Sequence, residues 1–400
     1  MELSIGGLID LVLAIGLGAS TWYYLTMLYS AREFFSRAPS PDPAQDLPPI
    51  TILKPLKGLD EGLYENLASL CEQDYGRFQI VFGVNDPSDP AVSVVRRLQA
   101  AYPRVDIELV VDARIYGTNY KISNLHNMYR FAKHEIIALA DSDIRIGRHC
   151  LRRLVSRLRD PGVGLVTCPY RAVNKGALPT LIETLFINTD FFGMVMVARK
   201  VERARYAFGA TIAMRREVLD EIGGFLPLVN HLADDYQLGN RVAVRGYELA
   251  LSEEVVDTVI SVGSWQRLLQ HQLRWARTYR ICRPGGYFGS IFTHGTLWAL
   301  LTVLCNRFSA ASVAAAASVV ALRYVAGAVL SWRDLRADTR WYELLLLAPK
   351  DLFISAIWFL AFVGDTVWWS GRHFRVLPNG EMLDLTPGHP TPAPAWQPVD

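Results

Sequence analysis

The chain has 400 residues, of which 51% are hydrophobic and 20% are charged, and its formal net charge is +2. It is therefore more apolar than an ordinary soluble enzyme, and its charge balance gives no indication of a nucleic-acid partner. Its five cysteines form no C-x-x-C pair, so the sequence predicts neither a zinc site nor a disulfide framework. A domain that faces the reducing cytosol fits this cysteine usage.

The chain begins with a long uncharged stretch at residues 5–29, interrupted only by Asp10. Its length matches one bilayer crossing, which needs about 20 residues. A cleaved signal peptide is the alternative, but no basic segment precedes the stretch and no A-x-A-like cleavage site follows it. Basic residues such as Arg32 come directly after it, which places the following domain on the cytoplasmic side. We therefore predict a transmembrane anchor at residues 1–31 and a stiff, Pro-rich linker at residues 32–49.

Residues 50–283 alternate short apolar, β-branched runs with helical patterns. Such runs are typical of buried strands, and their alternation with helices predicts an α/β fold with a mostly parallel sheet flanked by helices. Ligands of such sheets bind beyond the carboxyl ends of the strands. The predicted strands are residues 50–53, 79–84, 107–111, 136–140 and 164–167. The predicted helices are residues 62–72, 91–102, 121–133 and 150–158.

Apolar stretches return after residue 283, and we predict membrane segments over residues 284–375. The predicted spans lie near residues 287–304, 308–330 and 344–369. Lys350 and Asp351 interrupt the third span. We favour a helix end at the membrane interface, because long side chains reach the interface there; a polar contact that lines the path of a lipid is the alternative. Residues 376–400 form a polar, Pro-rich tail that we expect to be poorly ordered.

One predicted strand, at residues 136–140, ends in Asp141-Ser142-Asp143. A divalent cation prefers carboxylate oxygens and neutralises the charge that develops on a departing diphosphate. Because alternate residues at a strand end can surround one ion, we predict that Asp141 and Asp143 hold one divalent cation. An ordinary acidic loop is the alternative, but its position after a buried strand favours the metal site.

Two other strand-end segments carry candidates for binding a nucleotide. Asp86 follows the strand at residues 79–84, and its carboxylate can accept hydrogen bonds from a uracil or ribose. An Asx turn before Pro87 explains the same residue. Lys121 can contact a diphosphate, or it can be a solvated lysine at a helix start. The segment at residues 51–58 ends the first strand and is placed to touch the base.

Two adjacent carboxylates, Asp234 and Asp235, precede Tyr236. Neighbouring carboxylates oppose each other's ionisation, which raises a pKa and makes a better general base. A general base contributes about 10²–10⁴-fold to a rate. The alternative is a helix that carries acidic residues in its first turn.

The segment His271-Gln272-Leu273-Arg274-Trp275 lies just before the first C-terminal apolar stretch. Arg274 can grip a diphosphate in a fork-like contact, and Trp275 can form the floor of an acceptor pocket. An amphipathic helix that uses Arg and Trp as anchors at the membrane surface is the alternative.

The order of these motifs resembles that of inverting glycosyltransferases with the GT-A fold that act on lipids. Within them the chain is most similar to the ceramide glucosyltransferase family, which includes bacterial glycosyltransferases of hopanoid biosynthesis. The similarity extends over residues 10–375. The sequence motifs that carry the similarity are Leu53-Lys54-Pro55-Leu56-Lys57-Gly58, Lys121-Ile122-Ser123-Asn124-Leu125, Asp141-Ser142-Asp143-Ile144-Arg145, Asp234-Asp235-Tyr236, Leu273-Arg274-Trp275 and Trp369-Ser370-Gly371-Arg372.

The resemblance implies a UDP-sugar donor, Mg²⁺ or Mn²⁺, and inversion at the anomeric carbon in a single displacement. By position, Asp86 corresponds to the aspartate for the donor nucleotide, and Asp141 to the invariant aspartate of the metal motif. Asp143 corresponds to the direct metal ligand, and Asp235 to the base. Arg274 and Trp275 match the end of the last motif. His271 stands where the family has Gln or Arg, and a histidine there can make the activity depend on pH.

These features predict an integral membrane enzyme that transfers N-acetylglucosamine or glucose from a UDP-sugar to the hydroxyl of a membrane lipid. We favour a hopanoid polyol such as bacteriohopanetetrol as the acceptor, with ceramide as the alternative. The expected location is a bacterial inner membrane, with the catalytic domain facing the cytoplasm. The predicted partners are the donor, the lipid acceptor and the bilayer, with no nucleic acid.

Two other functions fit the motifs less well. A processive polysaccharide synthase needs a transmembrane channel, and only about four spans of roughly 20 residues are visible. A non-catalytic membrane scaffold has no physical need for four acidic positions.

Overall fold

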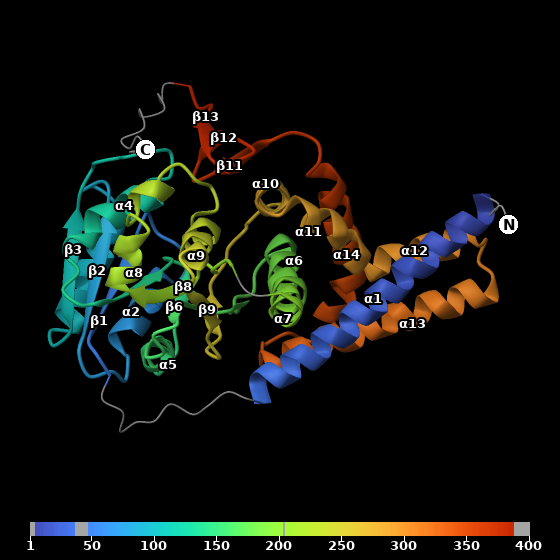
Figure 1. Ribbon diagram of the computed structural model, residues 1–400, viewed down its shortest axis with the longest axis horizontal. Coiled ribbons are helices and arrows are strands. Elements are labelled where there is room, and N and C mark those ends of the chain that lie inside the picture. Colours follow the sequence, from blue (N-terminus) through green and yellow to red (C-terminus); the bar gives the residue numbers. More distant parts are fainter. Residues whose placement is uncertain (1–4, 37–46, 203–204, 388–400) are drawn as a thin grey trace. The chain divides into compact units, whose positions relative to one another are not determined.

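Figure 1 shows the computed structural model, which describes residues 5–36, 47–202 and 205–387. Contacts divide the chain into two units of three segments each. The helical unit comprises Met1–Arg37, Ala172–Glu202 and Val262–Trp368, and the sheet unit comprises Ala38–Arg171, Arg203–Ser261 and Trp369–Asp400. The helical unit thus includes residues 172–202 and 262–283, both of which lie inside the predicted range 50–283. Much of the predicted linker, and residues 388–400 of the predicted tail, lie outside the described residues.

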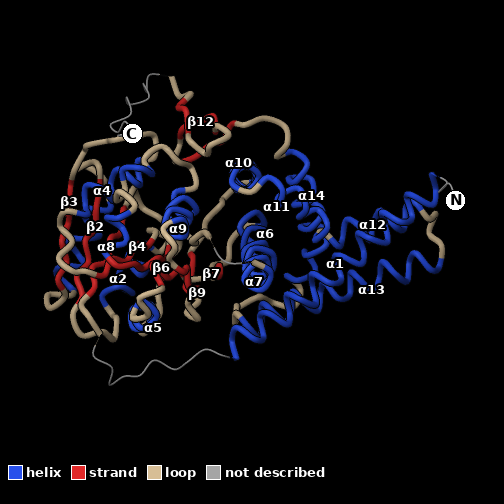
Figure 2. Tube along the Cα trace, viewed as in Figure 1, coloured by secondary structure: helices blue, strands red, loops and turns tan. Residues whose placement is uncertain are grey.

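The sheet unit is built on a seven-stranded sheet of order β3-β2-β1-β4-β8-β6-β9. Its strands are β1 (Ile50–Pro55), β2 (Phe78–Val84), β3 (Asp106–Val111), β4 (Ile136–Ala140), β6 (Val163–Thr167), β8 (Thr211–Arg215) and β9 (Glu248–Leu251). Within this sheet β8 is antiparallel to both of its neighbours, and all other pairs are parallel. The structure confirms the predicted mostly parallel sheet flanked by helices (Figure 2).

Helices cover both faces of this sheet, which explains why its central strands are continuous apolar runs rather than alternating ones. Side chains of each strand alternate between two cores. Ile52 packs with residues of α2, α3 and α5, whereas Leu53 packs with residues of α4, α8 and α9. These helices are α2 (Leu63–Cys71), α3 (Ala91–Ala101), α4 (Tyr120–Tyr129), α5 (Cys150–Leu158), α8 (Arg216–Glu221) and α9 (Asp234–Val244), with a 3₁₀ turn, η2, at Leu226–Leu228.

Short strands complete the sheet unit. β5 (Ile144–Arg145) pairs with β10 (Val256–Thr258), and their sheet includes β7 (Tyr170–Ala172). β12 (Arg372–Val376) pairs with β13 (Met382–Asp384), and the chain passes from the helical unit to the sheet unit within β11 (Thr366–Trp369). The prediction of poor order after residue 375 is therefore wrong as far as residue 387. Phe374 and Met382 are buried, so apolar burial orders this segment despite its prolines.

The helical unit has short turns of 3₁₀ and π helix between its α-helices. The π-helical turns η1 and η4 each continue a preceding α-helix. The elements are α1 (Ile5–Ser36), α6 (Leu178–Phe186), η1 (Ile187–Phe191), α7 (Phe192–Val201), α10 (Trp265–Cys282), α11 (Pro284–Gly289), η3 (Ser290–Thr293), α12 (Gly295–Cys305), α13 (Ala310–Ala328), η4 (Val329–Asp334), η5 (Glu343–Leu346) and α14 (Leu347–Leu360). Within this unit α1 contacts α7, α12 and α13.

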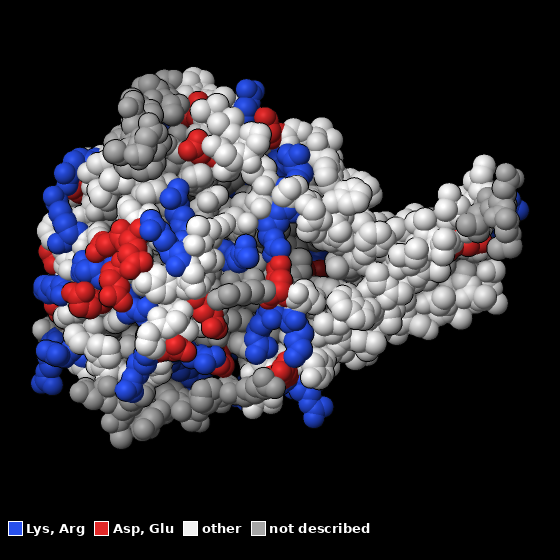
Figure 3. All heavy atoms as spheres, viewed as in Figure 1, with Lys and Arg blue, Asp and Glu red and all other residues white. Residues whose placement is uncertain are grey.

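Among the described residues, three helices are long and apolar enough to cross a membrane: Ile5–Ser36, Leu178–Val201 and Ala310–Asp334. Pro284–Thr293 and Gly295–Cys305, which are bent by 58° at their break, make a fourth candidate if they form one span. The surface of α1, α12 and α13 carries few charged side chains on the face shown in Figure 3. The predicted span at residues 344–369 is wrong, because α14 ends at Leu360 and a strand follows.

The helix Leu178–Val201 lies inside the range that the sequence assigned to the soluble domain. Its most apolar window is 78% buried within the protein, far more than that of Ile5–Ser36 at 17%. It is therefore an inner helix of the helical unit, which contacts other protein segments along most of its length.

Candidate active site

The predicted residues Lys121, Asp141 and Asp235 line one pocket of the sheet unit, together with Asp234 and Gly209. Asp141 directly follows β4, Lys121 lies in the first turn of α4, and the paired aspartates open α9. The pocket thus lies where the strand-end rule places a ligand.

Lys121 connects the two acidic motifs. Its Nζ lies 2.6 Å from Asp141 Oδ1 and 3.2 Å from Asp234 Oδ2. Asn119 fixes this arrangement, because its side chain caps α4 through the Ile122 N–H and also donates to Asp234. Burial alone would lower the pKa of Lys121, but the carboxylates of Asp141 and Asp234 outweigh it and raise the pKa. Lys121 is therefore a cation paired with two carboxylates of the pocket, and its contact with a diphosphate stays a prediction.

Asp235 is held by two backbone donors. Its Oδ2 accepts a hydrogen bond from the Gly209 N–H at 2.9 Å, and its Oδ1 accepts one from the Tyr236 N–H at 2.7 Å. Burial, and then the charge of the adjacent Asp234, raise the pKa of Asp235 to about 6. This is the environment that the paired aspartates predicted, and it suits a group that must take up a proton near neutral pH.

Gly209 is a residue that the sequence did not single out. A Cβ atom at this position would lie 3.2 Å from Asp235 Oδ2 and 3.4 Å from Asp141 Oδ2. The glycine therefore separates the carboxylates of the D-x-D and D-D-Y motifs, and a side chain there would crowd both.

Lys54 lies beneath the D-x-D loop rather than in the pocket. It is fully buried, and its Nζ donates a hydrogen bond to the Ile144 carbonyl at 2.8 Å. Burial lowers the pKa of Lys54 to about 8, against the opposing effect of Asp143 and Asp141. Its ammonium thus balances the acidic loop from inside the protein, so this part of the segment at residues 51–58 does not present a side chain to a nucleotide base.

The carboxylates of the D-x-D loop suit a divalent cation whose remaining ligands come from the substrate and from water. Asp143 accepts a hydrogen bond from the Thr258 hydroxyl at 2.9 Å. Burial and the neighbouring Asp141 raise the pKa of Asp143 to about 6, a repulsion that a dication would relieve. Within the described part of the chain, no three His, Cys, Asp or Glu side chains converge on a metal position. Mg²⁺ commonly binds through one or two carboxylates plus substrate phosphates and water, which matches Asp141 and Asp143.

Asp86 is exposed and does not line the pocket. Its Oδ1 accepts hydrogen bonds from the Ser88 N–H at 2.8 Å and from the Ser88 hydroxyl at 2.6 Å. The hydrogen bond from the Ser88 hydroxyl lowers the pKa of Asp86. The Asx turn that the sequence offered as an alternative is thus present, and the role of Asp86 in nucleotide binding stays a prediction.

His271, Arg274 and Trp275 all lie on α10 in the helical unit. His271 Nδ1 lies 2.6 Å from Glu183 Oε1, and the Gln272 amide donates to Glu183 Oε2 at 2.7 Å. The Glu183 side chain is fully buried. The histidine that departs from the family pattern thus has a dedicated carboxylate on α6, which no local sequence signal could identify.

The pairing of Glu183 predicts a stability effect. In Glu183→Leu the donors of His271 and Gln272 lose a buried acceptor, which typically costs about 1–3 kcal/mol for each unsatisfied group. We expect a clearly lowered unfolding temperature in detergent, and a smaller change in Glu183→Gln, whose amide oxygen still accepts from Gln272. Equal thermal stability of Glu183→Leu and the wild type would contradict this role.

A comparison with protein-family models identifies the chain's relatives. The model described as Glycosyl transferase family 21 matches residues 12–382. The chain belongs to this family.

The family 21 chain is 30% identical to "Ceramide glucosyltransferase 3" of Caenorhabditis elegans over 232 residues, which is 58% of this chain and 50% of the relative. It is 26% identical to "Ceramide glucosyltransferase 1" of the same organism over 214 residues, which is 53% of this chain and 45% of the relative. The chain spans about half the length of these curated relatives.

Among solved structures, the family 21 chain resembles a mannosyltransferase from Pyrobaculum calidifontis in complex with GDP-Man and Mn²⁺. The TM-score is 0.52 at 21% identity, and the match covers 88% of this chain and 99% of that one. This likeness supports the GT-A-type fold that the motifs implied.

Proposed function

We propose that this family 21 protein transfers a sugar from a UDP-sugar to the hydroxyl of a membrane lipid by metal-assisted inverting displacement. The observation that carries the proposal is the position of Gly209, which a carboxylate of each acidic motif flanks. Asp141 of the D-x-D motif and Asp235 of the base motif therefore lie close together, on either side of Gly209. This proximity suits a reaction in which a diphosphate leaves and a hydroxyl attacks at the same carbon.

Each group has a distinct part in the proposed reaction. The acceptor oxygen forms a bond to the anomeric carbon while the bond from that carbon to the diphosphate oxygen breaks. Asp235 receives the hydroxyl proton, and UDP leaves as an anion. Lys121, next to Asp141, would stabilise the negative charge that develops on the departing diphosphate, and Arg274 is proposed to contact the same diphosphate. Preorganised cations act strongly on such developing charge in a site that excludes water.

The remaining assignments follow the same proposal. Asp141 and Asp143 would hold Mg²⁺ or Mn²⁺, which supplies charge neutralisation to the leaving group. Asp86 would contact the uridine, while His271 and Trp275 would face the acceptor. The Mn²⁺ in the complex of the mannosyltransferase supports use of a divalent ion.

The acceptor has two candidates within one chemistry. The names of the curated relatives favour ceramide and glucose. The Asp141-Ser142-Asp143 form resembles that of the bacterial members and favours a hopanoid polyol and N-acetylglucosamine, in an inner membrane with the sheet unit facing the cytoplasm. Both acceptors offer a primary or secondary hydroxyl on an uncharged lipid, which is what Asp235 needs.

A direct test uses the purified full chain in lipid vesicles. UDP-glucose and UDP-N-acetylglucosamine are each offered with ceramide or bacteriohopanetetrol, and products are identified by mass spectrometry. We expect one glycosylated lipid that carries a single sugar and depends on Mg²⁺ or Mn²⁺. Polymer formation would instead support a synthase, and the absence of any glycolipid from all four pairs would overturn the proposal.

The raised pKa of Asp235 predicts the pH dependence of transfer. A general base acts only when it is deprotonated, so kcat/KM should fall as the pH drops through about 6 and reach a plateau at higher pH. A dication beside Asp141 favours the ionised form of nearby carboxylates, so a higher metal concentration should move the acid limb to lower pH. Initial rates between pH 5 and 8 at two Mn²⁺ concentrations test both effects, and a rate that rises on acidification would contradict them.

A further inference from the structure

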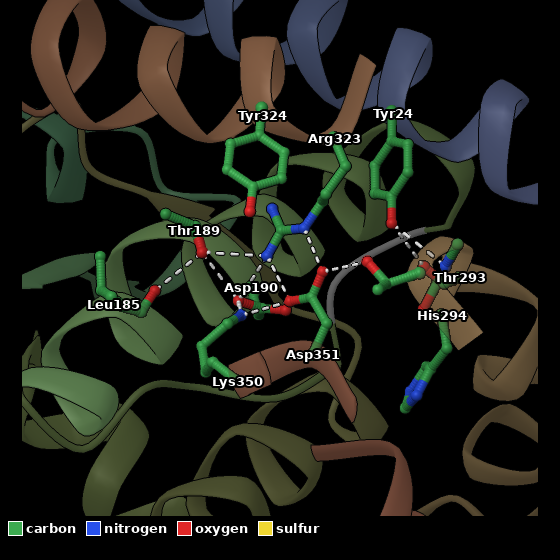
Figure 4. Close-up of polar contacts among 12 residues, drawn as sticks. Tyr24, Leu185, Thr189, Asp190, Thr293, His294, Arg323, Tyr324, Lys350 and Asp351 are labelled. Carbon is green, nitrogen blue, oxygen red and sulfur yellow. Dashed lines mark hydrogen bonds and ion pairs between the residues drawn. The ribbon is translucent and has the colours of Figure 1, made fainter. Parts of the chain in front are cut away.

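A second cluster of charged side chains lies inside the helical unit (Figure 4). Arg323 on α13 lies between Asp351 on α14 and Asp190 on η1. Arg323 Nε lies 2.9 Å from Asp351 Oδ2, and Arg323 Nη2 lies 3.0 Å from Asp190 Oδ2. Lys350 Nζ lies 2.8 Å from Asp351 Oδ1 and also contacts Asp190. Two cations and two anions therefore balance one another.

The position of this cluster corrects the interpretation favoured from the sequence. Lys350 is fully buried and Asp351 is 7% exposed, so neither side chain reaches a membrane interface. Burying charges is costly unless they are paired and hydrogen-bonded. Ionisable residues within membrane segments face the interior of a bundle and mark functional positions, so the cluster needs a reason beyond the end of a helix.

The two carboxylates differ in how they are used. Both oxygens of Asp351 are engaged, because Oδ1 contacts Arg323 and Lys350 while Oδ2 accepts from Arg323 and from the Thr296 hydroxyl at 2.7 Å. In Asp190 a single oxygen, Oδ2, accepts the hydrogen bonds from Thr189, Arg323 and Lys350. Within the described residues Oδ1 has no recorded donor, and the Asp190 side chain is 22% exposed.

Asp190 lies at an irregular position of the backbone. It lies on the π-helical turn Ile187–Phe191, in the middle of the inner helix Leu178–Val201, and such turns are frequent at functional sites. The ring of Trp275, which we assign to the acceptor side, packs against Phe186 at 5.9 Å and Phe191 at 5.8 Å between ring centroids. These two phenylalanines bracket the turn, so Trp275 of α10 packs on the same stretch of the inner helix that carries Asp190.

We propose that Asp190 is the residue of the helical unit that binds the polar head of the acceptor lipid, through a hydrogen bond from a lipid O–H or amide N–H to Oδ1. This inference rests on the proposed function. An ionised carboxylate only accepts hydrogen bonds, so Oδ1 favours a head with O–H or N–H donors and cannot donate to the phosphate of ordinary phospholipids. Since the cluster is already neutral, an uncharged head leaves no buried charge uncompensated. Ceramide and a hopanoid polyol both supply such donors.

The test uses two double variants with the same charge balance. Asp190→Leu/Lys350→Met and Lys350→Met/Asp351→Leu each remove one cation and one anion, and each leaves Arg323 paired with one aspartate. Only the first removes the Asp190 carboxylate. Binding of a short-chain fluorescent ceramide and of bacteriohopanetetrol is measured in an uncharged detergent without UDP-sugar. We expect the first variant to bind the preferred lipid about tenfold or more weakly, as the loss of a hydrogen bond to a charged group implies, and the second to stay within about threefold of the wild type.

A third arm uses phosphatidylcholine, whose head has a phosphate but no O–H or N–H donor, and we expect little binding of this lipid to any of the proteins. Equal loss of lipid binding in both double variants would assign the cluster a purely structural role and overturn the inference. Unchanged binding in the first variant would overturn it as well. The measurement needs no turnover, so a wild type that binds hydroxylated lipid yet forms no glycolipid would refute the proposed function and not this binding site.

A second measurement needs no substitution. Carbodiimide coupling of a small amine to carboxylates, read by mass spectrometry, should label Asp190 and leave Asp351 unlabelled. Added ceramide or polyol should protect Asp190, whereas phosphatidylcholine, which has no O–H or N–H donor, should not. Labelling of Asp190 that no hydroxylated lipid reduces would contradict the inference even if neither double variant folds.

Discussion

Asp235→Asn is expected to abolish sugar transfer while the donor still binds. The amide has nearly the shape of the carboxylate but cannot take up the acceptor proton. Because positioned general bases contribute about 10²–10⁴-fold, kcat should fall by that factor. The Gly209 N–H donates to Oδ2 of Asp235 and the Tyr236 N–H to Oδ1, so the NH₂ group of asparagine leaves one of these two donors without its acceptor. Steady-state transfer rates and calorimetric titration with UDP measure the two effects separately.

The matched control for this prediction is Asp234→Asn. Asp234 carries a charge beside Lys121 and receives the Asn119 amide, but it does not hold Gly209. We expect Asp234→Asn to lower the affinity for UDP, and to lower kcat less than Asp235→Asn does. Retention of more than a tenth of the wild-type rate in Asp235→Asn would exclude this residue as the base.

Asp143→Ala is expected to remove the dependence of donor binding on metal. In the free protein this carboxylate is repelled by Asp141, and its pKa is raised to about 6 by burial and that neighbour. Its loss should therefore cost little stability without ligand. A ligand at 100 times its dissociation constant stabilises the native state by about 2.7 kcal/mol. We expect Mn²⁺ with UDP to raise the unfolding temperature of the wild type and to leave that of Asp143→Ala nearly unchanged.

Asp60→Asn provides the control for the metal prediction. Asp60 is another carboxylate of the acidic loop region and accepts a hydrogen bond from the Ser142 hydroxyl, but it lies outside the D-x-D motif. It should keep most of the stabilisation by Mn²⁺ and UDP. The same metal-induced shift in Asp143→Ala as in the wild type would remove Asp143 from the metal site.

Five of the seven strands of the sheet could be predicted from the sequence, whereas β8 and β9 could not. The strand at residues 136–140 and the helix at residues 150–158 have the predicted bounds, because β4 is a continuous buried run and α5 has a strong apolar stripe. The membership of residues 172–202 in the helical unit could not be predicted. Leu178–Val201 contains Glu183 and Asp190, and their partners lie on α10, α13 and α14, far along the chain. Only the folded structure reveals that these charges are compensated.

The same distinction applies to the site. Asp141, Lys121 and Asp235 could be predicted because each occupies a strand end or a helix start facing one edge of the sheet. Gly209 and Lys54 could not, since their roles depend on the spacing between segments that are distant in sequence. Gly209 matters through its approach to two carboxylates, and Lys54 through its burial beneath the loop.

The place of β8 in the sheet has a consequence for how the chain is made. β8 lies between β4 and β6, yet the 70 residues 141–210 separate the end of β4 from the start of β8. At usual synthesis rates of about 5–20 residues per second, this interval lasts roughly 4–14 s. During that time the hydrogen-bonding edge of β4 lacks its native partner, and exposed strand edges invite pairing with other chains. The inner helix is synthesised within the same interval, so a nascent chain must be protected from aggregation while its membrane segments are being delivered.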